Sequence, residues 1–351
     1  MNTRIICVQE EQICEKDDLL RQAGKILKDG GLVAFPTETV YGLGGDGLNR
    51  ESSKKIYAAK GRPSDNPLII HIVDMDALPH IVSRVTPEVE KVAAAFWPGP
   101  LTMILPKSEQ VPDETTGGLD TVAVRMPSHK VARKLIEYAG GYVAAPSANA
   151  SGKPSPTLAK YVVEDMDGRI DMIIDGGEVG IGLESTIIDM TVNPPQILRP
   201  GFITEGMLSQ VLGQVDMDKT ILSADSGLAP KAPGMKYRHY APKGQLTIVT
   251  GESQKVVDYI NEQVALAHQQ GMKAGVIGTQ ELLAEYQADV VKSAGYRDDE
   301  QQIAHNLFRI LREFDDENVD VIFSESFDHA QLGQAIMNRL LKAAGHRVHN
   351  V

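Results

Sequence analysis

The chain reads Pro36-Thr-Glu-Thr-Val-Tyr-Gly-Leu-Gly44 and then, after a helix-like span, Lys60-Gly-Arg-Pro-Ser-Asp-Asn-Pro-Leu-Ile-Ile-His71. Hydroxyls, two cations, an amide and an imidazole stand here beside the ends of short apolar runs, and polar groups at strand ends tend to point into a cleft. Lys60 and Arg62, followed by a proline-rich turn, suit a phosphate-bearing ligand. A solvated helix end with its loop fits these residues equally well.

The composition predicts a globular protein of two domains. The chain has 351 residues, of which 42% are hydrophobic and 23% are charged, and this length is comfortable for two cores. The formal net charge of -12 argues against broad electrostatic binding of nucleic acid, which needs a basic face. We therefore expect no strong direct binding of nucleic acid.

The cysteines and the apolar runs predict a cytoplasmic location. Cys7 and Cys14 form no Cys-x-x-Cys pair, which fits a reducing compartment and excludes a disulfide scaffold or a cysteine-based zinc site. The first residues become polar too quickly for a signal peptide. No apolar run is long enough to span a bilayer, so we expect no membrane partner.

Residues 1–213 are predicted to form a mixed α/β domain with a twisted sheet. Helices are expected from residue 17 to the Gly30-Gly31 stop, and from Thr86, Ser128 and Thr204. Apolar runs bounded by turn residues predict strands at residues 32–35, 68–72, 101–105, 121–125, 142–145, 172–174 and 186–189. Because helices and strands do not alternate strictly, the sheet is predicted to be mixed.

Residues 245–351 follow a more regular pattern. Strands are expected at residues 246–249, 273–277, 288–291 and 319–323, alternating with helices at 253–268, from Glu281, at 299–314 and at 334–344. This alternation predicts a small parallel, Rossmann-like sheet that is covered on both sides. No catalytic constellation is evident in this domain.

Residues 214–244 are predicted to connect the two domains. Hydrophobic periodicity fails here, and residues 229–243 are rich in proline, cations and aromatic rings, including Tyr237, His239 and Tyr240. A plain linker is more often Gly/Ser-rich or simply charged. Two interpretations remain open: a linker that packs on the domains, and a lid that contacts a ligand.

A second polar cluster follows the strand-like run at residues 142–145. Ser147 and Asn149 lie among small residues that let a ligand approach the backbone, and with Lys60 and Arg62 they could surround phosphate oxygens. Thr121 and Arg125 are expected on one face of their strand, which suggests that this face lines a cavity. Arg199 fits either a surface position or a phosphate contact.

Several common site motifs are excluded. Gly42-Leu-Gly-Gly-Asp-Gly47 matches the dinucleotide pattern only weakly, because it does not follow a strand end directly. No phosphate-binding loop of the G-x-x-x-x-G-K-[ST] type, no H-E-x-x-H metal motif and no G-x-S-x-G nucleophile elbow is present. A bound nucleotide would therefore be held by side chains and strand-end amides.

Together, these segments resemble a known family. The order and spacing of the two stretches in residues 36–71, of Arg125-Met-Pro, Pro146-Ser-Ala-Asn149, Glu184-Ser-Thr186 and Leu198-Arg-Pro-Gly201 resemble the YrdC-like domain. The segment Pro233-Gly-Met-Lys-Tyr-Arg-His-Tyr-Ala-Pro242 resembles the linker of the two-domain threonylcarbamoyl-AMP synthases. The C-terminal domain is matched only by its length and α/β pattern.

The resemblance implies a nucleotidyltransferase that joins L-threonine, bicarbonate or CO2, and ATP into threonylcarbamoyl-AMP, releases pyrophosphate, and supplies the tRNA threonylcarbamoyl-transfer machinery. Magnesium is expected with ATP, without a protein ligand that can be named. The resemblance places the catalytic cations at Lys60 and Arg62. It places threonine contacts at Thr39, His71, Arg125, Ala145 and Ser185, and ATP contacts at Arg62, Asn66, Thr121, Ser147, Asn149, Ser155, Arg199 and Tyr237.

These residue types suit such a reaction, because the protein needs to align the reactants and offset charge without a covalent nucleophile. Two other functions remain open at this point. One is an RNA-binding or ribosome-assembly module, which the acidic net charge disfavours. The other is a carbamoyltransferase that uses carbamoyl phosphate.

Overall fold

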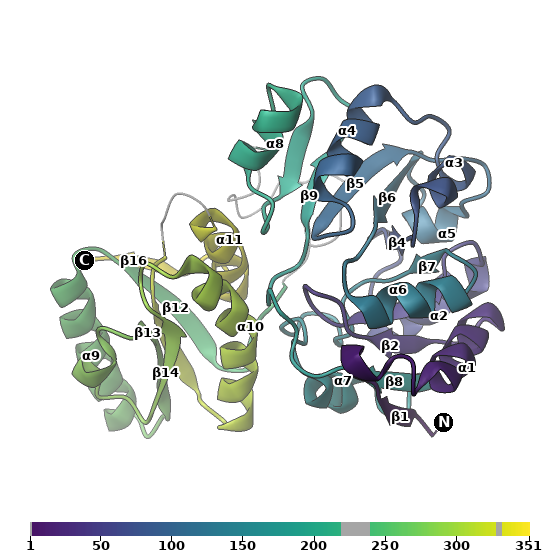
Figure 1. The fold of residues 1–351 in the computed structure, drawn as a ribbon. Helices are drawn as coiled ribbons and strands as arrows, with labels where there is room; N and C mark the ends of the chain where they lie inside the picture. Colours follow the sequence, from purple (N-terminus) through teal and green to yellow (C-terminus); the bar gives the residue numbers. More distant parts are fainter. Residues whose placement is uncertain (1, 219–238, 328–331) are drawn as a thin grey trace.

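The computed structural model describes residues 2–218, 239–327 and 332–351, and its strands form two sheets (Figure 1). The first is an 11-stranded mixed sheet in the order β1-β8-β2-β3-β7-β4-β6-β5-β9-β10-β11. Its strands are β1 (Arg4–Cys7), β2 (Val33–Phe35), β3 (Gly42–Asp46), β4 (Ile69–His71), β5 (Leu101–Pro106), β6 (Thr121–Arg125), β7 (Val143–Ala144), β8 (Met172–Asp175), β9 (Thr186–Asp189), β10 (Gln196–Arg199) and β11 (Asp216–Met217).

Helices cover both faces of this sheet. They are α1 (Asp17–Lys28), α2 (Arg50–Lys60), α3 (Leu78–Ile81), α4 (Pro87–Phe96), α5 (Asp113–Thr116), α6 (Lys130–Tyr138), α7 (Ala159–Met166) and α8 (Glu205–Leu212). In β2, Val33 and Phe35 pack with residues of α1 and α6, whereas Ala34 packs on the opposite face with residues of α2 and α7. This alternation follows from the two-residue period of a strand.

The second sheet has five parallel strands in the order β14-β13-β15-β12-β16. They are β12 (Gln245–Thr250), β13 (Ala274–Thr279), β14 (Val290–Gly295), β15 (Val321–Glu325) and β16 (Val348–Asn350). In β12, Ile248 joins the core under α10 (Glu300–Asp316) and α11 (Gly333–Ala343). Its neighbour Val249 joins the core under α9 (Ser253–Gln269) on the other face.

The predicted fold class, a mixed sheet followed by a covered parallel sheet, is confirmed. One predicted element is wrong: the helix expected from Glu281 is only a 3-10 turn at Leu283–Glu285. The turn ends where Tyr286 enters the core and its hydroxyl donates to Glu325 at 2.9 Å. The following strand accordingly starts at Val290, later than expected. Strand β3 was not expected, since four of the residues in Gly42–Leu–Gly–Gly–Asp46 disfavour strands.

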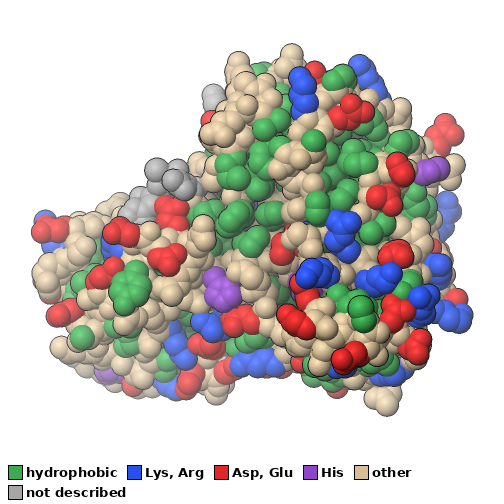
Figure 2. Space-filling view, viewed as in Figure 1, with side chains coloured by type: hydrophobic (Ala, Val, Ile, Leu, Met, Phe, Trp, Pro, Cys, Tyr) green, Lys and Arg blue, Asp and Glu red, His purple; other side chains and the backbone are tan. Residues whose placement is uncertain are grey.

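The surface and the helices bear on two further expectations. Among the described residues, no helix combines the length and apolar character needed to cross a membrane. On the face seen in Figure 2, Lys and Arg side chains are interspersed with Asp and Glu side chains, without a continuous basic field.

Candidate active site

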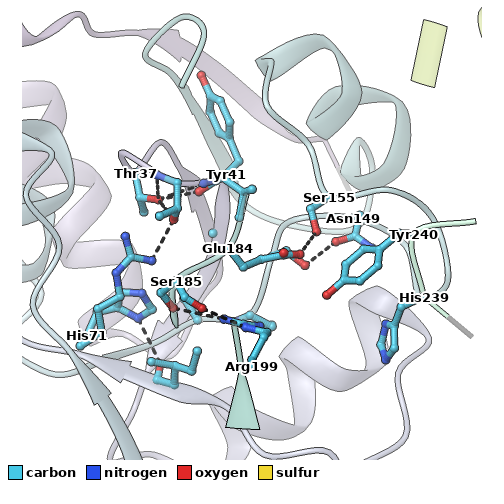
Figure 3. A pocket seen from close by; sticks show the side chains of 18 of the residues that line it. Thr37, Tyr41, His71, Asn149, Ser155, Glu184, Ser185, Arg199, His239 and Tyr240 are labelled. Atoms are coloured by element: carbon cyan, nitrogen blue, oxygen red, sulfur yellow. Dashed lines mark hydrogen bonds between the residues drawn. The ribbon is translucent and has the colours of Figure 1, made fainter. Parts of the chain in front are cut away.

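A cavity lies where several strand ends of the first sheet meet (Figure 3). Strands β4 and β6 run parallel, and the register pairs His71 with Arg125 at their ends. The segments after β7 and before β9 also reach the cavity. Its lining consists of Thr37, Thr39, Val40, Tyr41, Gly42, Arg62, Ile69, His71, Arg125, Ala145, Pro146, Ser147, Asn149, Ser155, Glu184, Ser185, Arg199, His239 and Tyr240.

The end of α2 sets the positions of Lys60 and Arg62. Gly61 adopts φ 62°, a left-handed conformation that favours glycine, and it ends the helix between the two cations. The Lys60 ammonium donates to the backbone carbonyls of Ser147 and Asn149, the latter at 2.6 Å. The Lys60 side chain therefore points toward the loop that carries these residues and stabilises this part of the cavity wall.

Arg62 lies on the cavity side of the same turn. Its Nη2 donates to the carbonyl oxygens of Asn66 and Pro67, both at 3.1 Å. Burial lowers the pKa of Arg62 to about 10. Burial, assisted by the charge of Arg62, also lowers the pKa of Lys60 well below its ordinary value. Two partly desolvated cations so close together favour an anionic ligand.

Arg125 and His71 form a second polar group. The Arg125 guanidinium donates to the Thr39 hydroxyl at 2.9 Å and pairs with the Glu38 carboxylate at 2.7 Å. His71 Nδ1 donates to the carbonyl of Ile69 at 3.1 Å. Burial, and then the charge of Arg125, lower the pKa of His71 to about 3, so this imidazole is neutral at physiological pH.

Arg199 and Glu184 complete the wall on the side of β9 and β10. Arg199 donates from Nε to the Ser185 carbonyl at 3.0 Å and from Nη2 to the Ser185 hydroxyl at 3.1 Å. The Glu184 carboxylate accepts from the Ser155 hydroxyl at 2.7 Å and extends toward it across the cavity (Figure 3). Burial alone would raise the pKa of Glu184, but the charges of Arg339 and Arg199 outweigh it and lower the pKa.

The structure brings together most of the residues that sequence reasoning selected. Thr39, Arg62, His71, Arg125, Ala145, Ser147, Asn149, Ser155, Ser185 and Arg199 line the cavity. Lys60 and Asn66 are buried behind its wall and contact lining residues. Thr121 lies at the opposite end of β6 from Arg125 and is not part of the lining. Tyr237 lies outside the described residues.

Sequence reasoning did not select Glu184, His239 or Tyr240 as site residues. Glu184 precedes Ser185 in the Glu184-Ser-Thr186 motif, but a carboxylate directly before a strand is also typical of a polar sheet edge. Tyr240 is 4% exposed, and its ring lies 4.9 Å from that of Phe308 in α10. His239 and Tyr240 both line the cavity, and the linker and lid interpretations of their segment both remain open.

The described residues contain no group of three or more His, Cys, Asp or Glu side chains that could hold a metal ion. The two carboxylates at the cavity are already engaged, since Glu38 pairs with Arg125 and Glu184 pairs with Arg339. The side chains of the site thus offer cations, hydroxyls and amides for anionic oxygens. They do not offer a preformed metal centre.

Comparisons with known proteins agree on the family. Residues 25–201 match a family model described as "Telomere recombination", and residues 203–345 match one described as "Threonylcarbamoyl-AMP synthase, C-terminal domain". The chain is 50% identical to a threonylcarbamoyl-AMP synthase of Pyrococcus abyssi, over 94% of this chain and 95% of that protein. It is 46% identical to one of Bacillus subtilis, over 96% of each.

The fold is likewise similar to that of a solved relative. The crystal structure of P. abyssi Sua5 complexed with L-threonine superimposes with a TM-score of 0.94 at 49% sequence identity, over 99% of this chain and 100% of the other. The similarity therefore extends over both sheets.

Proposed function

Because the chain belongs to the threonylcarbamoyl-AMP synthase family, we propose that its cavity joins L-threonine, bicarbonate or CO2, and ATP into threonylcarbamoyl-AMP and pyrophosphate. The observation that carries this proposal is the convergence of Arg62, Arg125 and Arg199 on one cavity with hydroxyl and amide partners. Such a set suits a ligand pair that carries a triphosphate and an amino-acid carboxylate.

Threonine is proposed to bind at the group around Arg125. The guanidinium offers a planar fork to the carboxylate of the substrate, and Thr39, His71, Ala145 and Ser185 surround it. The solved relative that binds L-threonine supports this choice of amino acid. The neutral imidazole of His71 brings no second positive charge to the substrate's amine, which must lose its proton before it reacts.

ATP is proposed to bind along Arg62, Arg199 and the loop that carries Ser147, Asn149 and Ser155. Two buried atoms support this placement, because Arg62 Nε and Asn66 Oδ1 find no hydrogen-bond partner among the described residues. Buried polar atoms without partners are costly, and a ligand that reaches them recovers part of that cost. Thr121 and Tyr237 remain proposed ATP contacts on the strength of the family resemblance alone.

The proposed reaction has two steps. The neutral amine of threonine forms a bond to the carbon of CO2, one C=O electron pair moves onto oxygen, and the nitrogen releases a proton to solvent, which leaves a carbamate. A carbamate oxygen then attacks the α-phosphorus of ATP, the bond from that phosphorus to the bridging oxygen breaks, and pyrophosphate leaves. Lys60 and Arg62 are proposed as the catalytic cations that offset the charge on the phosphates, Arg62 at the cavity and Lys60 from behind the loop.

Magnesium is proposed to arrive with ATP and to be held by its phosphate oxygens and water. Mg²⁺ prefers oxygen ligands and keeps several waters, so the phosphates of ATP are able to hold it. We further propose that the adenylate forms in the cytoplasm and passes to the machinery that modifies tRNA.

The proposal is tested by incubating the protein with ATP, L-threonine and bicarbonate, with pyrophosphate measured and the product identified by mass. Pyrophosphate release that requires both threonine and bicarbonate is the expected result. Release that persists without threonine, or consumption of carbamoyl phosphate instead of bicarbonate with ATP, would refute the proposal. A filter-binding assay with a short RNA serves as the control for an RNA-binding module.

A further inference from the structure

The second part of the chain supports the cavity from behind with two buried arginines. Helices α10 and α11 lie on the side of the second sheet that faces the first sheet (Figure 1). Arg312 of α10 is 2% exposed and Arg339 of α11 is 0% exposed. Both guanidinium groups bond to the first domain, in the segments next to the site residues.

Arg312 holds the loop assigned to ATP. Its Nε and Nη2 both donate to the carbonyl of Pro154, at 3.0 and 2.7 Å, directly before Ser155. Its Nη1 and Nη2 form a bidentate pair with Asp165 of α7, at 3.2 and 2.6 Å. Asp165 in turn accepts from the backbone of Ala150 at 3.0 Å, next to Asn149. Arg312 thus fixes both ends of the segment from Asn149 to Ser155.

Arg339 joins the two segments that carry Ser185 and Arg199. Its Nε donates to the Glu184 carboxylate at 3.1 Å, and its Nη2 donates to the Glu184 carbonyl at 3.3 Å. Its Nη1 donates to the carbonyl of Pro200, the residue after Arg199. The same Glu184 carboxylate accepts from Ser155 at 2.7 Å. Through Glu184 and Pro200, Arg339 is therefore linked to three lining residues, Ser155, Ser185 and Arg199.

Stability alone is a poor explanation for these contacts. Desolvating a charge is expensive, and a well-packed apolar interface between domains often stabilises as much or more. A planar guanidinium that donates several hydrogen bonds fixes the relative positions of its acceptors, which apolar contacts do not. Resting on the proposed function, we propose that Arg312 and Arg339 are positioning residues, through which the C-terminal domain sets the geometry of the ATP-binding and threonine-binding walls.

The two arginines then differ in their effects on the substrates. The hydrogen bonds of Arg312 among the described residues lie on the side of Ser155 and Asn149, so its loss is expected to weaken ATP binding and to leave threonine binding unchanged. Arg339 bonds next to both Ser185 and Arg199, so its loss is expected to weaken both. A residue that contributed only to folding would not separate the two substrates in this way.

The test compares Arg312→Gln, Arg339→Gln and the control Arg309→Gln by isothermal titration with ATP and with L-threonine separately, and by KM and kcat for pyrophosphate release. Arg309 is a matched control, since it lies on the same helix and pairs across the two domains with Glu178 at 3.4 Å, away from the cavity lining. We expect Arg312→Gln to raise the KM for ATP by about tenfold or more. The control is expected to change neither affinity.

Unchanged threonine affinity also shows that Arg312→Gln is folded. If Arg312→Gln does not fold, Arg312→Lys, which keeps the charge and lacks the fork, is measured for the same separation of substrates. For Arg312, ATP affinity equal to that of Arg309→Gln, equal loss of affinity for ATP and threonine, or failure of both Arg312 variants to fold would each overturn the inference. For Arg339→Gln, unchanged affinity for either substrate would overturn it. Failure of the proposed function is distinct, because it shows as absent pyrophosphate release by the unsubstituted protein.

Discussion

Replacement of Lys60 by methionine tests how far the loop from Ser147 to Asn149 governs the reaction. The ammonium donates to both backbone carbonyls of this loop, and Lys60 is only 3% exposed. Each buried acceptor that loses its partner costs about 1–3 kcal/mol. Methionine carries no charge that must be desolvated on folding, and this recovers part of that cost. We expect a net loss of about 1–3 kcal/mol in the free energy of unfolding, which leaves the protein folded.

The effect on the reaction is expected to be larger than the effect on stability. The variant loses a positive charge behind the phosphates and frees the loop that carries two of the proposed ATP contacts. Loss of a contact that strengthens in the transition state costs about 2–4 kcal/mol, or roughly a hundredfold or more in rate. Arg62→Ala is expected to lose activity to a similar extent, since it removes the other catalytic cation at the cavity.

The assay measures pyrophosphate release with all three substrates, and circular dichroism and thermal unfolding verify the fold. Lys54→Met is the matched control, because Lys54 lies on the same helix, is 53% exposed at its side chain and pairs with Glu51 at the surface. Turnover of Lys60→Met as high as that of Lys54→Met would refute the reasoning. It would mean that the position of the loop does not limit the reaction.

Three further predictions follow from the site. Valine is expected to be a poorer substrate than serine by kcat/KM, because it leaves a buried polar partner of the threonine hydroxyl unpaired while serine lacks only a methyl; equal use of valine and threonine would contradict the assigned pocket. Unfolded His71 takes up a proton below pH 6.5 and folded His71 only near its pKa of about 3, so stability falls as the pH drops through this window. Between pH 7 and 5, the free energy of unfolding of His71→Asn is therefore expected to fall by about 2 kcal/mol less than that of the unsubstituted protein. Urea unfolding at both pH values measures this difference. Equal falls in the two proteins would contradict a neutral buried imidazole. A chain that ends after Asp218 is expected to fold and to form the adenylate at least about tenfold more slowly, because Tyr240, Arg312 and Arg339 are missing; full activity would reduce these residues to a structural role.

Local sequence signals predicted most of the fold. The runs that became β4, β5, β6 and β9 are short, apolar and bounded by turn residues, and these properties act within a few residues. The alternation in the C-terminal part predicted its parallel sheet for the same reason. The glycine-rich β3 escaped prediction, because its stability comes from pairing with β2 and β7 and not from the propensity of its own residues.

The site was predictable only where its residues share a short segment. Lys60 and Arg62 stand two apart, and Ser147 and Asn149 also stand two apart, so both pairs were visible as polar clusters. Arg312 and Arg339 look like ordinary helix residues in the sequence. Their role depends on contacts with Asp165 and Glu184 more than a hundred residues away. Such contacts follow from how two folded parts pack, which no local pattern records.

The electrostatics of the cavity explain why a second domain supports it. Arg62, Arg125 and Arg199 line the cavity together with the carboxylate of Glu184, and the Glu38 carboxylate pairs with Arg125. Burial lowers the pKa of both Arg62 and Arg199 to about 10, which means that folding places these charges in an environment less favourable than water. A flexible wall would let the cations move apart into solvent. In the role proposed for Arg312 and Arg339, their buried hydrogen bonds fix the wall, so these charges stay in place until an anionic substrate offsets them. A rigid wall keeps the arginines buried in the empty site, which costs desolvation free energy. The same fixed arginines favour binding of a triphosphate, because its negative charge offsets theirs.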